Sequence, residues 1–444
     1  MDNLSSKQRI FQAVDKRKNE IIELGDAVYR CPETGFREFA ASGLIADKFR
    51  EMGLHFIQPE NIPGLKVTLD TGREGPGIAI LGELDAVVCS EHPDANPQTG
   101  AVHACGHNVQ VASMVGAAMG ILDSGILGEL CGKIHFIAVP AEEYIEVDFR
   151  KELKERGIIS YLGGKPEFLR RGFFDDVDIC CMIHVWPGIS KLAVDTSFNG
   201  CMVKKAKFIG KAAHAGQAPH EGINALYAAN LSLTAINSIR ETFREEDFIR
   251  VHPIMTKGGG VVNVIPDDVR IEMFVRSKTI DGILSSSKKV DRALVGGAVA
   301  MGAAVEIEDI PGYMPYNVDK NLVTLAKSNI RELYGSDAED LGHTTGSSDL
   351  GDISSLMPVI QLYAPGVSGG LHSREFKLND PESSYIMSSK LLAAMALDLL
   401  KNNAELAGDV VKKYDPVFKS KEEYFDFTDK IFSKRLFSAQ NILK

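Results

Sequence analysis

The sequence lacks the features of a membrane-spanning, exported or nucleic-acid-binding protein. No apolar run reaches the roughly 18 residues that a membrane-spanning helix needs. Acidic residues outnumber basic ones by 60 to 49, and the net charge of −11 argues against a uniformly basic surface for nucleic acid. The first 20 residues are polar and mixed in charge, without the apolar core of a signal peptide. We therefore expect a cytoplasmic protein with no membrane association and no nucleic-acid partner.

Cysteine is also scarce, and its use argues against a disulfide framework. The seven cysteines are odd in number and belong to a long chain without an export signal. The sequence has no internal repeat and no low-complexity tract, and its 44% hydrophobic and 25% charged residues are typical of globular proteins. Because 444 residues exceed one ordinary hydrophobic core, we expect two domains.

Three short apolar runs predict buried strands in the first part of the chain. They cover residues 78–84, 134–140 and 179–185 and are almost continuously apolar, as strands covered on both faces are. A stretch rich in Ala and Gly, residues 109–122, has helical spacing and lies between the first two runs. This alternation predicts an α/β domain with a mostly parallel sheet.

The pattern changes near residue 198, where half-exposed strands and amphipathic helices begin to alternate. The predicted elements are strands at 202–210, 248–255, 261–276 and 305–310 and helices at 223–243 and 283–301. Their order, β-α-β-β-α-β, is that of a ferredoxin-like sandwich. We therefore predict a small domain at 198–312, inserted into a larger domain formed by residues 1–197 and 313–444.

The segment His103-Ala104-Cys105-Gly106-His107 is the strongest local signal of chemistry. Residues two apart on an extended segment point to the same side, so Cys105 and His107 can bind one metal ion. A thiolate and an imidazole suit a borderline-soft ion such as zinc. Two other interpretations fit this fragment alone: a buried cysteine beside the first histidine of a helix, or a cysteine nucleophile with a histidine base.

Other candidate residues follow predicted strands, where open α/β sheets bind their ligands. They are Asp85, Glu142, Glu143, His184 and His372. Of two adjacent carboxylates, one can bind a metal ion while the other takes a proton from the attacking water. Asp85 can accept the second N–H of a metal-bound histidine. Taken singly, each acidic residue also fits an ordinary acidic loop, and each histidine fits a core residue whose hydrogen bonds are satisfied. Their shared position at one edge of the sheet is what favours a metal site.

The order of the motifs resembles the co-catalytic metallopeptidase family of aminoacylases and glutamate carboxypeptidases. The motifs are GELDA, HACGH, PAEE, IHVWPG, AHAGQAPHEGINAL, NVIPDD, GSSDLGD and LHS, and the resemblance runs from about residue 20 to residue 400. Within this family the chain is most similar to the amidohydrolase branch. That branch includes auxin-conjugate, hippurate and N-acyl-amino-acid, aminobenzoyl-glutamate and dipeptide hydrolases.

The resemblance implies a two-domain metallohydrolase with two divalent metal ions per subunit. The implied ligands are Cys105, His107, Glu143, His184 and His372. Cys105 would bridge the two ions, Glu142 would be the general base, and Asp85 would orient His107. Zinc suits these ligands, and manganese, cobalt and nickel remain alternatives.

The resemblance also implies that the small domain is a dimerisation lid. His214 would reach a substrate carbonyl oxygen, in the active site of the partner subunit, and Asn263 and Arg276 would hold a substrate carboxylate. Without the resemblance, His214 fits an ordinary turn and Arg276 an ordinary strand charge. The implied protein is a homodimer that hydrolyses the amide bond of a small N-acyl-amino acid, an aminobenzoyl-glutamate-like conjugate or a dipeptide.

Several features depart from the family pattern. The branch often has the motif CGHDxH, and in this chain Asn108 and Gln110 take the places of its Asp and its last His. Glu83 stands where other branches have a metal-binding histidine. Residues 144–178 form a charge-rich segment that is longer than usual and can alter substrate choice. Two alternative functions remain: hydrolysis of an N-carbamoyl amino acid, and ligand binding without catalysis by a dimer of the same fold. Metal content distinguishes a metal site from mere reuse of the fold, and turnover distinguishes an enzyme from a binding protein.

Overall fold

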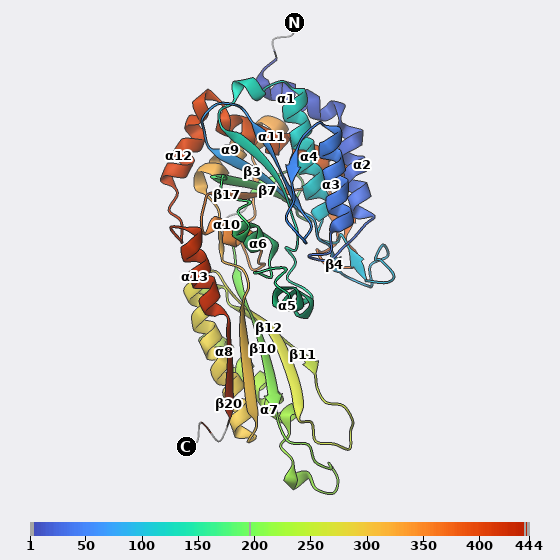
Figure 1. Ribbon diagram of the computed structural model, residues 1–444, viewed down its shortest axis with the longest axis vertical. Coiled ribbons are helices and arrows are strands. Elements are labelled where there is room, and N and C mark those ends of the chain that lie inside the picture. The colour runs from blue at the N-terminus through green and yellow to red at the C-terminus, as the bar shows by residue number, and fades with distance from the viewer. Residues whose placement is uncertain (1–3, 195–196, 439–440, 442–444) are drawn as a thin grey trace. The chain divides into compact units, whose positions relative to one another are not determined.

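The computed structural model describes residues 4–194, 197–438 and 441. It divides into two compact units, each with its own sheet (Figure 1). Each unit also has its own hydrophobic core. The first unit comprises Met1–Thr196, Asn317–His343 and Asp352–Val417. The second comprises Ser197–Tyr316, Thr344–Gly351 and Phe418–Lys444.

The first unit is built on an eight-stranded mixed sheet with the order β1-β2-β6-β3-β7-β17-β8-β15. Its centre is β6 (Lys133–Val139), β3 (Gly77–Glu83), β7 (Ile179–Val185) and β17 (Val359–Ala364), which run parallel to one another. The outer strands are β1 (Phe56–Ile57), β2 (Leu65–Asp70), β8 (Ala193–Val194) and β15 (Glu339–Asp340). Burial of β3, β6 and β7 along almost their whole length explains the three nearly continuous apolar runs, as predicted.

Helices cover this sheet, and α4 (His107–Asp123) is the most deeply buried of the long ones. The others are α1 (Ser6–Lys16), α2 (Lys18–Tyr29), α3 (Phe39–Glu51), α5 (Val147–Glu155), α6 (Gly164–Arg170), α9 (Lys320–Tyr334), α11 (Met387–Leu400) and α12 (Glu405–Lys413). Helix α4 packs on β3 and against α1, α2 and α11. A Cβ at Gly116 would lie 2.3 Å from Ser389 Oγ, so this close packing needs a glycine.

The second unit has an antiparallel sheet with the order β11-β12-β10-β13-β20. Its strands are β10 (Gly200–Ile209), β11 (Arg250–Lys257), β12 (Asp268–Ser277), β13 (Ala304–Pro311) and β20 (Ser433–Ser438). Helices α7 (Ala225–Ile239) and α8 (Ile280–Ala300) pack on β12 and β10. Because helices cover one face only, burial alternates along β12, and the first four strands with both helices form the predicted ferredoxin-like arrangement.

The boundaries of the two units differ from the predicted 1–197, 198–312 and 313–444. Residues 344–351 and 418–444 belong to the second unit. Helix α13 (Lys421–Ile431) contacts β13, and β20 pairs antiparallel with β13 from Asp309↔Ser433 to Ala304↔Ser438. The end of the chain therefore adds a fifth strand to the small sheet, a long-range pairing that local patterning does not reveal.

The remaining short elements connect these parts. They are β4 (Val87–Val88), β5 (Ala101–Val102), β9 (Ser197–Phe198), β14 (Tyr316–Asn317), β16 (His343–Thr344), α10 (Leu350–Ser354), β18 (Val367–Ser368) and β19 (Lys377–Leu378). None of the helices in the described part of the chain is both long enough and apolar enough to cross a membrane.

Candidate metal centre

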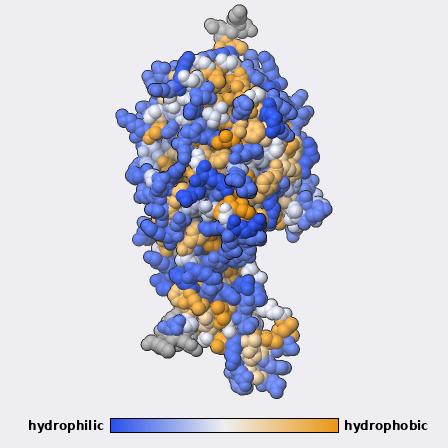
Figure 2. Space-filling view, viewed as in Figure 1, coloured by the Kyte–Doolittle hydropathy of each residue, from blue (hydrophilic) through white to orange (hydrophobic). Residues whose placement is uncertain are grey.

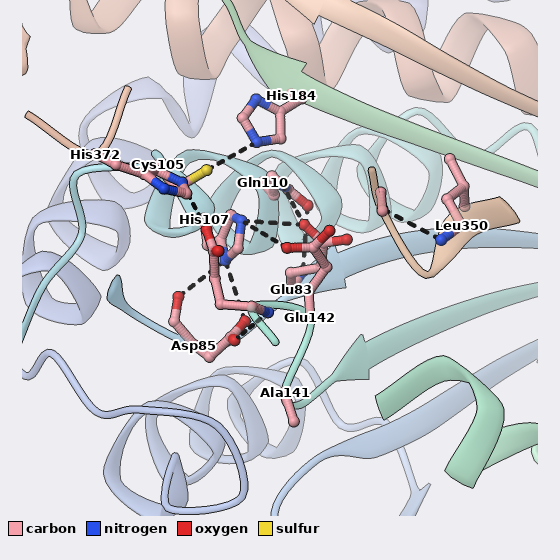
Figure 3. A network of polar contacts seen from close by, with 12 residues as sticks. Glu83, Asp85, Cys105, His107, Gln110, Ala141, Glu142, His184, Leu350 and His372 are labelled. Atoms are coloured by element: carbon pink, nitrogen blue, oxygen red, sulfur yellow. Dashed lines mark hydrogen bonds and ion pairs between the residues drawn. The ribbon is translucent and has the colours of Figure 1, made fainter. Parts of the chain in front are cut away.

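Acidic, imidazole and thiol side chains of the first unit converge where its parallel strands end (Figure 3). Glu83 is the last residue of β3, and His184 is the last but one of β7. Glu142 and Glu143 follow β6 after a short turn in which Ala141 has a φ of 58°. The carboxyl-terminal edge of the sheet therefore collects them, as the strand pattern predicts.

The turn at Gly106 delivers Cys105 and His107 to the same place. Gly106 has a φ of 82°, and a Cβ there would lie 2.3 Å from Val185 Cγ2, so both conformation and space require glycine. His107 is the first residue of α4. The prediction of one extended segment is wrong, because this left-handed turn and not a strand brings the two side chains together.

His372 reaches the centre from the loop after β18. Its φ of 58° is unusual for a residue other than glycine, and its N–H donates to the carbonyl oxygen of Ala104 at 2.9 Å. This contact ties the His372 loop to the segment that carries Cys105. A residue held in a sparsely populated conformation beside such a cluster is typical of a functional site.

Two groups of donor atoms share Cys105. One is Cys105, His107 and His184, and the other is Cys105, Glu143 and His372, with the donor atoms of each group within 4.8 Å of one another. The Sγ atom of Cys105 lies 3.3 Å from Nε2 of His184. On the other side, Nε2 of His372 lies 2.8 Å from Oε1 of Glu143. The five predicted ligands therefore lie together, with the sulfur common to both groups.

Asp85 contacts a member of each group. Nδ1 of His107 donates to the carbonyl oxygen of Asp85 at 2.9 Å and faces its Oδ1 at 3.2 Å. The other carboxylate oxygen of Asp85 accepts from the N–H of Glu143 at 2.8 Å. Because Nδ1 is used in this way, the lone pair of Nε2 of His107 points into the cluster.

The electrostatics of the centre are those of a cation site. Burial raises the pKa of the Cys105 thiol, but the imidazoles of His184 and His107 outweigh burial and hold that pKa well below its usual value. Burial lowers the pKa of His372, whereas Cys105 and Glu143 raise it, to about 11. The thiolate thus favours positive charge in its surroundings, on the neighbouring imidazoles or on a bound cation.

The residues present fit metal ions. Nε2 of His107 is buried and makes no hydrogen bond to any described residue. A buried imidazole nitrogen without a hydrogen bond is available to bind a metal ion. Together with a thiolate and a second imidazole, it forms a typical zinc-type donor set. On the other side, a thiolate, a carboxylate and an imidazole form a mixed donor set that also suits manganese, cobalt or nickel.

Glu142 lies beside these groups without belonging to either. Its side chain is about nine-tenths buried, and its Oε2 lies 4.0 Å from Nε2 of His107. It forms a third group of possible donors with His107 and Glu83. This arrangement places a carboxylate next to the ligands, where proton transfer to or from a bound molecule needs it.

The structure adds supporting residues that the sequence motifs do not include. Arg150 of α5 is fully buried and donates to the carbonyl oxygens of Ala141, Leu162 and Glu143. Oε1 of the buried Glu38 accepts from the N–H of Ala141 at 2.7 Å. These contacts hold the turn that carries Glu142 and Glu143. The signal in the sequence for Arg150 was the charge-rich segment 144–178, which carries no motif, and Glu38 lies outside both that segment and the motifs.

His214, Asn263 and Arg276 lie in the second unit. The N–H of Ala215 donates to the carbonyl oxygen of Asn263 at 2.9 Å, so the His214 turn and the Asn263 loop are neighbours. Nδ1 of His214 accepts from the N–H of Gln217 at 3.0 Å. Arg276 lies in β12, separate from that turn, and its Nη1 donates to Ser347 Oγ at 3.2 Å.

Known proteins with similar sequences are hydrolases. The chain is 28% identical over 418 residues to a mouse Xaa-Arg dipeptidase, covering 90% of each protein. It is 26% identical over 335 residues to one of the polypeptides of the p-aminobenzoyl-glutamate hydrolase of Escherichia coli K12, covering 72% of this chain and 64% of that polypeptide.

A solved structure shares the fold. The YxeP protein of Bacillus subtilis, described as a dinuclear metal binding peptidase from the M20 family, superimposes with a TM-score of 0.67 at 21% identity. The match covers 87% of this chain and 99% of that one. Residues 79–398 match the sequence model described as Peptidase family M20/M25/M40. With the two groups of donors around Cys105, this match shows that the chain belongs to peptidase family M20/M25/M40 and is a hydrolase of amide or peptide bonds.

Proposed function

We propose that this protein is a two-metal amidohydrolase that cleaves a dipeptide, an aminobenzoyl-glutamate-like conjugate or a small N-acyl-amino acid. The observation that carries the proposal is the pair of donor groups that share Cys105, with Glu142 beside them. Cys105, His107 and His184 would hold one ion, and Cys105, Glu143 and His372 the other. When bound, two divalent ions polarise a carbonyl group and lower the pKa of water.

Glu142 is the proposed general base. It accepts a proton from the attacking water and returns this proton to the leaving nitrogen, so that the carbon–nitrogen bond breaks and an amine leaves. Asp85 keeps Nε2 of His107 directed toward the ions. His214 stabilises the negative charge that develops on the carbonyl oxygen, a role for which a positioned donor typically contributes about a hundredfold or more in rate. Asn263 and Arg276 bind the substrate carboxylate.

The names of the similar proteins support substrates that end in a free amino-acid carboxylate. A dipeptide and p-aminobenzoyl-glutamate both contain a secondary amide next to such a carboxylate, and the relatives named for them are similar to this chain over most of its length. Arg276 is a cation suited to that carboxylate. An N-carbamoyl amino acid offers the same carboxylate and remains the second candidate substrate.

The second unit supports the proposal of a homodimer. At one edge of its sheet, β20 covers β13, whereas at the other edge β11 pairs with β12 alone among the described strands. Ile254 of β11 and Val261 and Val262 of the next loop are 64%, 61% and 102% exposed. Figure 2 shows hydrophobic residues at this end of the second unit. An open edge with apolar neighbours is a typical surface for pairing with a second copy.

The test is hydrolysis by protein reconstituted with zinc, manganese, cobalt or nickel. The panel contains dipeptides with basic and neutral C-terminal residues, aminobenzoyl-glutamate, N-acyl-amino acids and N-carbamoyl amino acids. Glu142→Gln should lower kcat by about 10²–10⁴-fold and keep the metal content, because the amide cannot accept the proton. Glu167→Gln, another buried glutamate in the first unit, is the matched control and should keep its activity.

Two outcomes would overturn the proposal. If the protein binds two ions but cleaves no member of the panel, ligand binding without catalysis replaces hydrolysis as the function. If it cleaves substrates equally well after Glu142→Gln, Glu142 is not the base.

A further inference from the structure

A fourth carboxylate, that of Glu83, lies in the metal centre together with a buried lysine. Glu83 and Lys165 are 1% and 0% exposed, and the lysine Nζ binds Oε1 of Glu83. The amide of Gln110 fixes the glutamate further, since its Nε2 donates to Oε2 at 2.7 Å and its Oε1 accepts from the N–H of Glu83 at 3.2 Å. Glu83 is therefore held in one orientation by a cation and an amide.

This orientation directs the other oxygen of Glu83 at the candidate ligand His107. Oε2 of Glu83 lies 3.2 Å from Nε2 of His107, the nitrogen that makes no hydrogen bond to a described residue (Figure 3). The donor atoms of Glu83, His107 and Glu142 lie within 4.8 Å of one another. A cation bound at Nε2 would therefore meet a carboxylate oxygen that is already in place, in addition to Cys105 and His184.

The lysine comes from the long charge-rich segment 144–178, whose role the motifs leave open. Lys165 is the second residue of α6, and α6 begins against the end of β6. A Cβ at Gly164 would lie 1.6 Å from the carbonyl oxygen of Pro140, so only glycine permits this approach. Residues 140 and 142 are close neighbours in the chain, and the segment thus reaches the metal centre from beside the Glu142 turn.

We propose that Glu83 is an additional donor to the metal ion bound by His107, and that Lys165 is the residue that positions it. This inference rests on the two-metal centre proposed above. Lys165 takes Oε1 of the carboxylate, and Oε2, which accepts one hydrogen bond from Gln110, keeps a lone pair for the ion. In the metal-free protein Lys165 compensates the buried charge of Glu83, and in the loaded protein the metal ion shares that task.

The first test is titration of the Glu83→Gln variant with cobalt. Calorimetry measures the affinity of each site, and the absorption bands of cobalt bound to thiolate report its donor set. The affinity of one of the two sites should fall by roughly a hundredfold or more, because loss of a direct donor costs more than the tenfold to hundredfold typical of a supporting group, while the other site keeps its affinity. The cobalt bands of the weakened site should shift, because its donor set changes. Glu167→Gln, a buried glutamate of α6 that pairs with Arg171, is the control and should titrate like the wild type.

The second test separates positioning from general support of the fold. Lys165→Met should lower Tm more in the metal-free protein than in the loaded protein, because a bound ion takes over part of the charge compensation. Lys66→Met is the matched control. Lys66 is also buried and pairs with Asp176 of the same charge-rich segment, so its loss should lower Tm equally with and without metal.

A double variant controls for misfolding, because it removes both buried charges, that of Glu83 and that of Lys165, together. Glu83→Gln with Lys165→Met leaves no unpaired buried charge, and this double variant should show the same weakened site as Glu83→Gln. If Glu83→Gln and the double variant bind both ions like the wild type with unchanged cobalt bands, Glu83 is not a donor. If Lys165→Met loses the same Tm with and without metal, the positioning role fails. If the wild type itself does not bind two ions, the proposed function fails with it.

Discussion

Each unit of this protein buries a cluster of charges, and the two clusters differ in charge balance. In the second unit, Lys204 is fully buried and binds Asp291 at 2.6 Å, and it also contacts Asp309. Arg435 of β20 binds the same two carboxylates, Asp291 at 2.9 Å. Two cations and two anions therefore neutralise one another. This balance needs no ligand, and it ties the C-terminal strand to the sheet.

The cluster in the first unit is unbalanced. Glu83 pairs with Lys165, but the other acidic groups of the cluster face imidazoles, which carry positive charge only when protonated: Asp85, Glu142, Glu143 and the Cys105 thiol. Burying these acidic groups costs free energy unless positive charge is supplied, by protonated imidazoles in the metal-free protein or by metal ions bound in their place. Charge balance therefore distinguishes a buried network that stabilises the fold from one that is suited to receive cations.

The largest effect that tests this distinction is expected from Cys105→Ala. Because its sulfur belongs to both donor groups, both ions should bind more weakly by more than about a hundredfold, since a direct ligand matters more than a supporting group. Metal content after gel filtration measures the loss. Cys131→Ala is the control, because Cys131 is buried just before the start of β6, at the opposite end from Glu142. Two ions retained at wild-type affinity in Cys105→Ala would show that the sulfur is not shared.

The balanced cluster should respond in stability and not in metal binding. Lys204→Met leaves Arg435 as the cation described beside Asp291 and Asp309, and breaking a buried ion pair in this way costs about 3–5 kcal/mol in the free energy of unfolding. Denaturant unfolding measures this cost, and calorimetry with cobalt should find both metal affinities unchanged. A lower metal affinity in this variant would remove the distinction between the two clusters.

The smallest effect concerns His135 of β6, a buried histidine in the first unit. Burial, with the nearby charge of Lys66, lowers its pKa to about 4, and the unfolded chain has the ordinary value near 6.5. The unfolded state therefore binds more protons between these values, and the stabilising contribution, complete above about pH 6.5, is lost as the pH falls toward 4. His135→Gln should make the loss of stability over this range smaller by about 3 kcal/mol.

Chemical denaturation at several pH values measures the change for His135→Gln. His55→Gln is the control for the general effect of losing a histidine, since His55 is exposed. Equal pH dependence in the wild type and in His135→Gln would mean that His135 does not titrate differently on folding.

Much of the fold follows from local pattern. The apolar runs at 78–84, 134–140 and 179–185 correspond to β3, β6 and β7 within one or two residues, because strands buried on both faces tolerate few polar side chains. The strand and helix order of the second unit follows from alternation and helical spacing in the same way. What patterning missed is β20, whose place is decided by pairing with β13, more than 100 residues earlier in the chain.

The candidate ligands were also predictable, since Cys105, His107, Glu143, His184 and His372 are chemically suited to metal and follow strand ends. The supporting residues were not. Arg150 and Lys165 lie in a charge-rich segment that would suit a solvent-exposed surface equally well, and nothing in their local sequence indicates that both are fully buried.

Local sequence alone specifies which segments become buried strands and which residues can bind metal, because periodicity and side-chain chemistry are local properties. Tertiary packing was needed to establish that Cys105 serves both donor groups, that Glu83 faces His107, and that Lys165 compensates its charge. These depend on distances between segments far apart in the chain. A contact of about 3 Å between two buried side chains exists only after the strands, the turn at Gly106 and helix α6 have packed together.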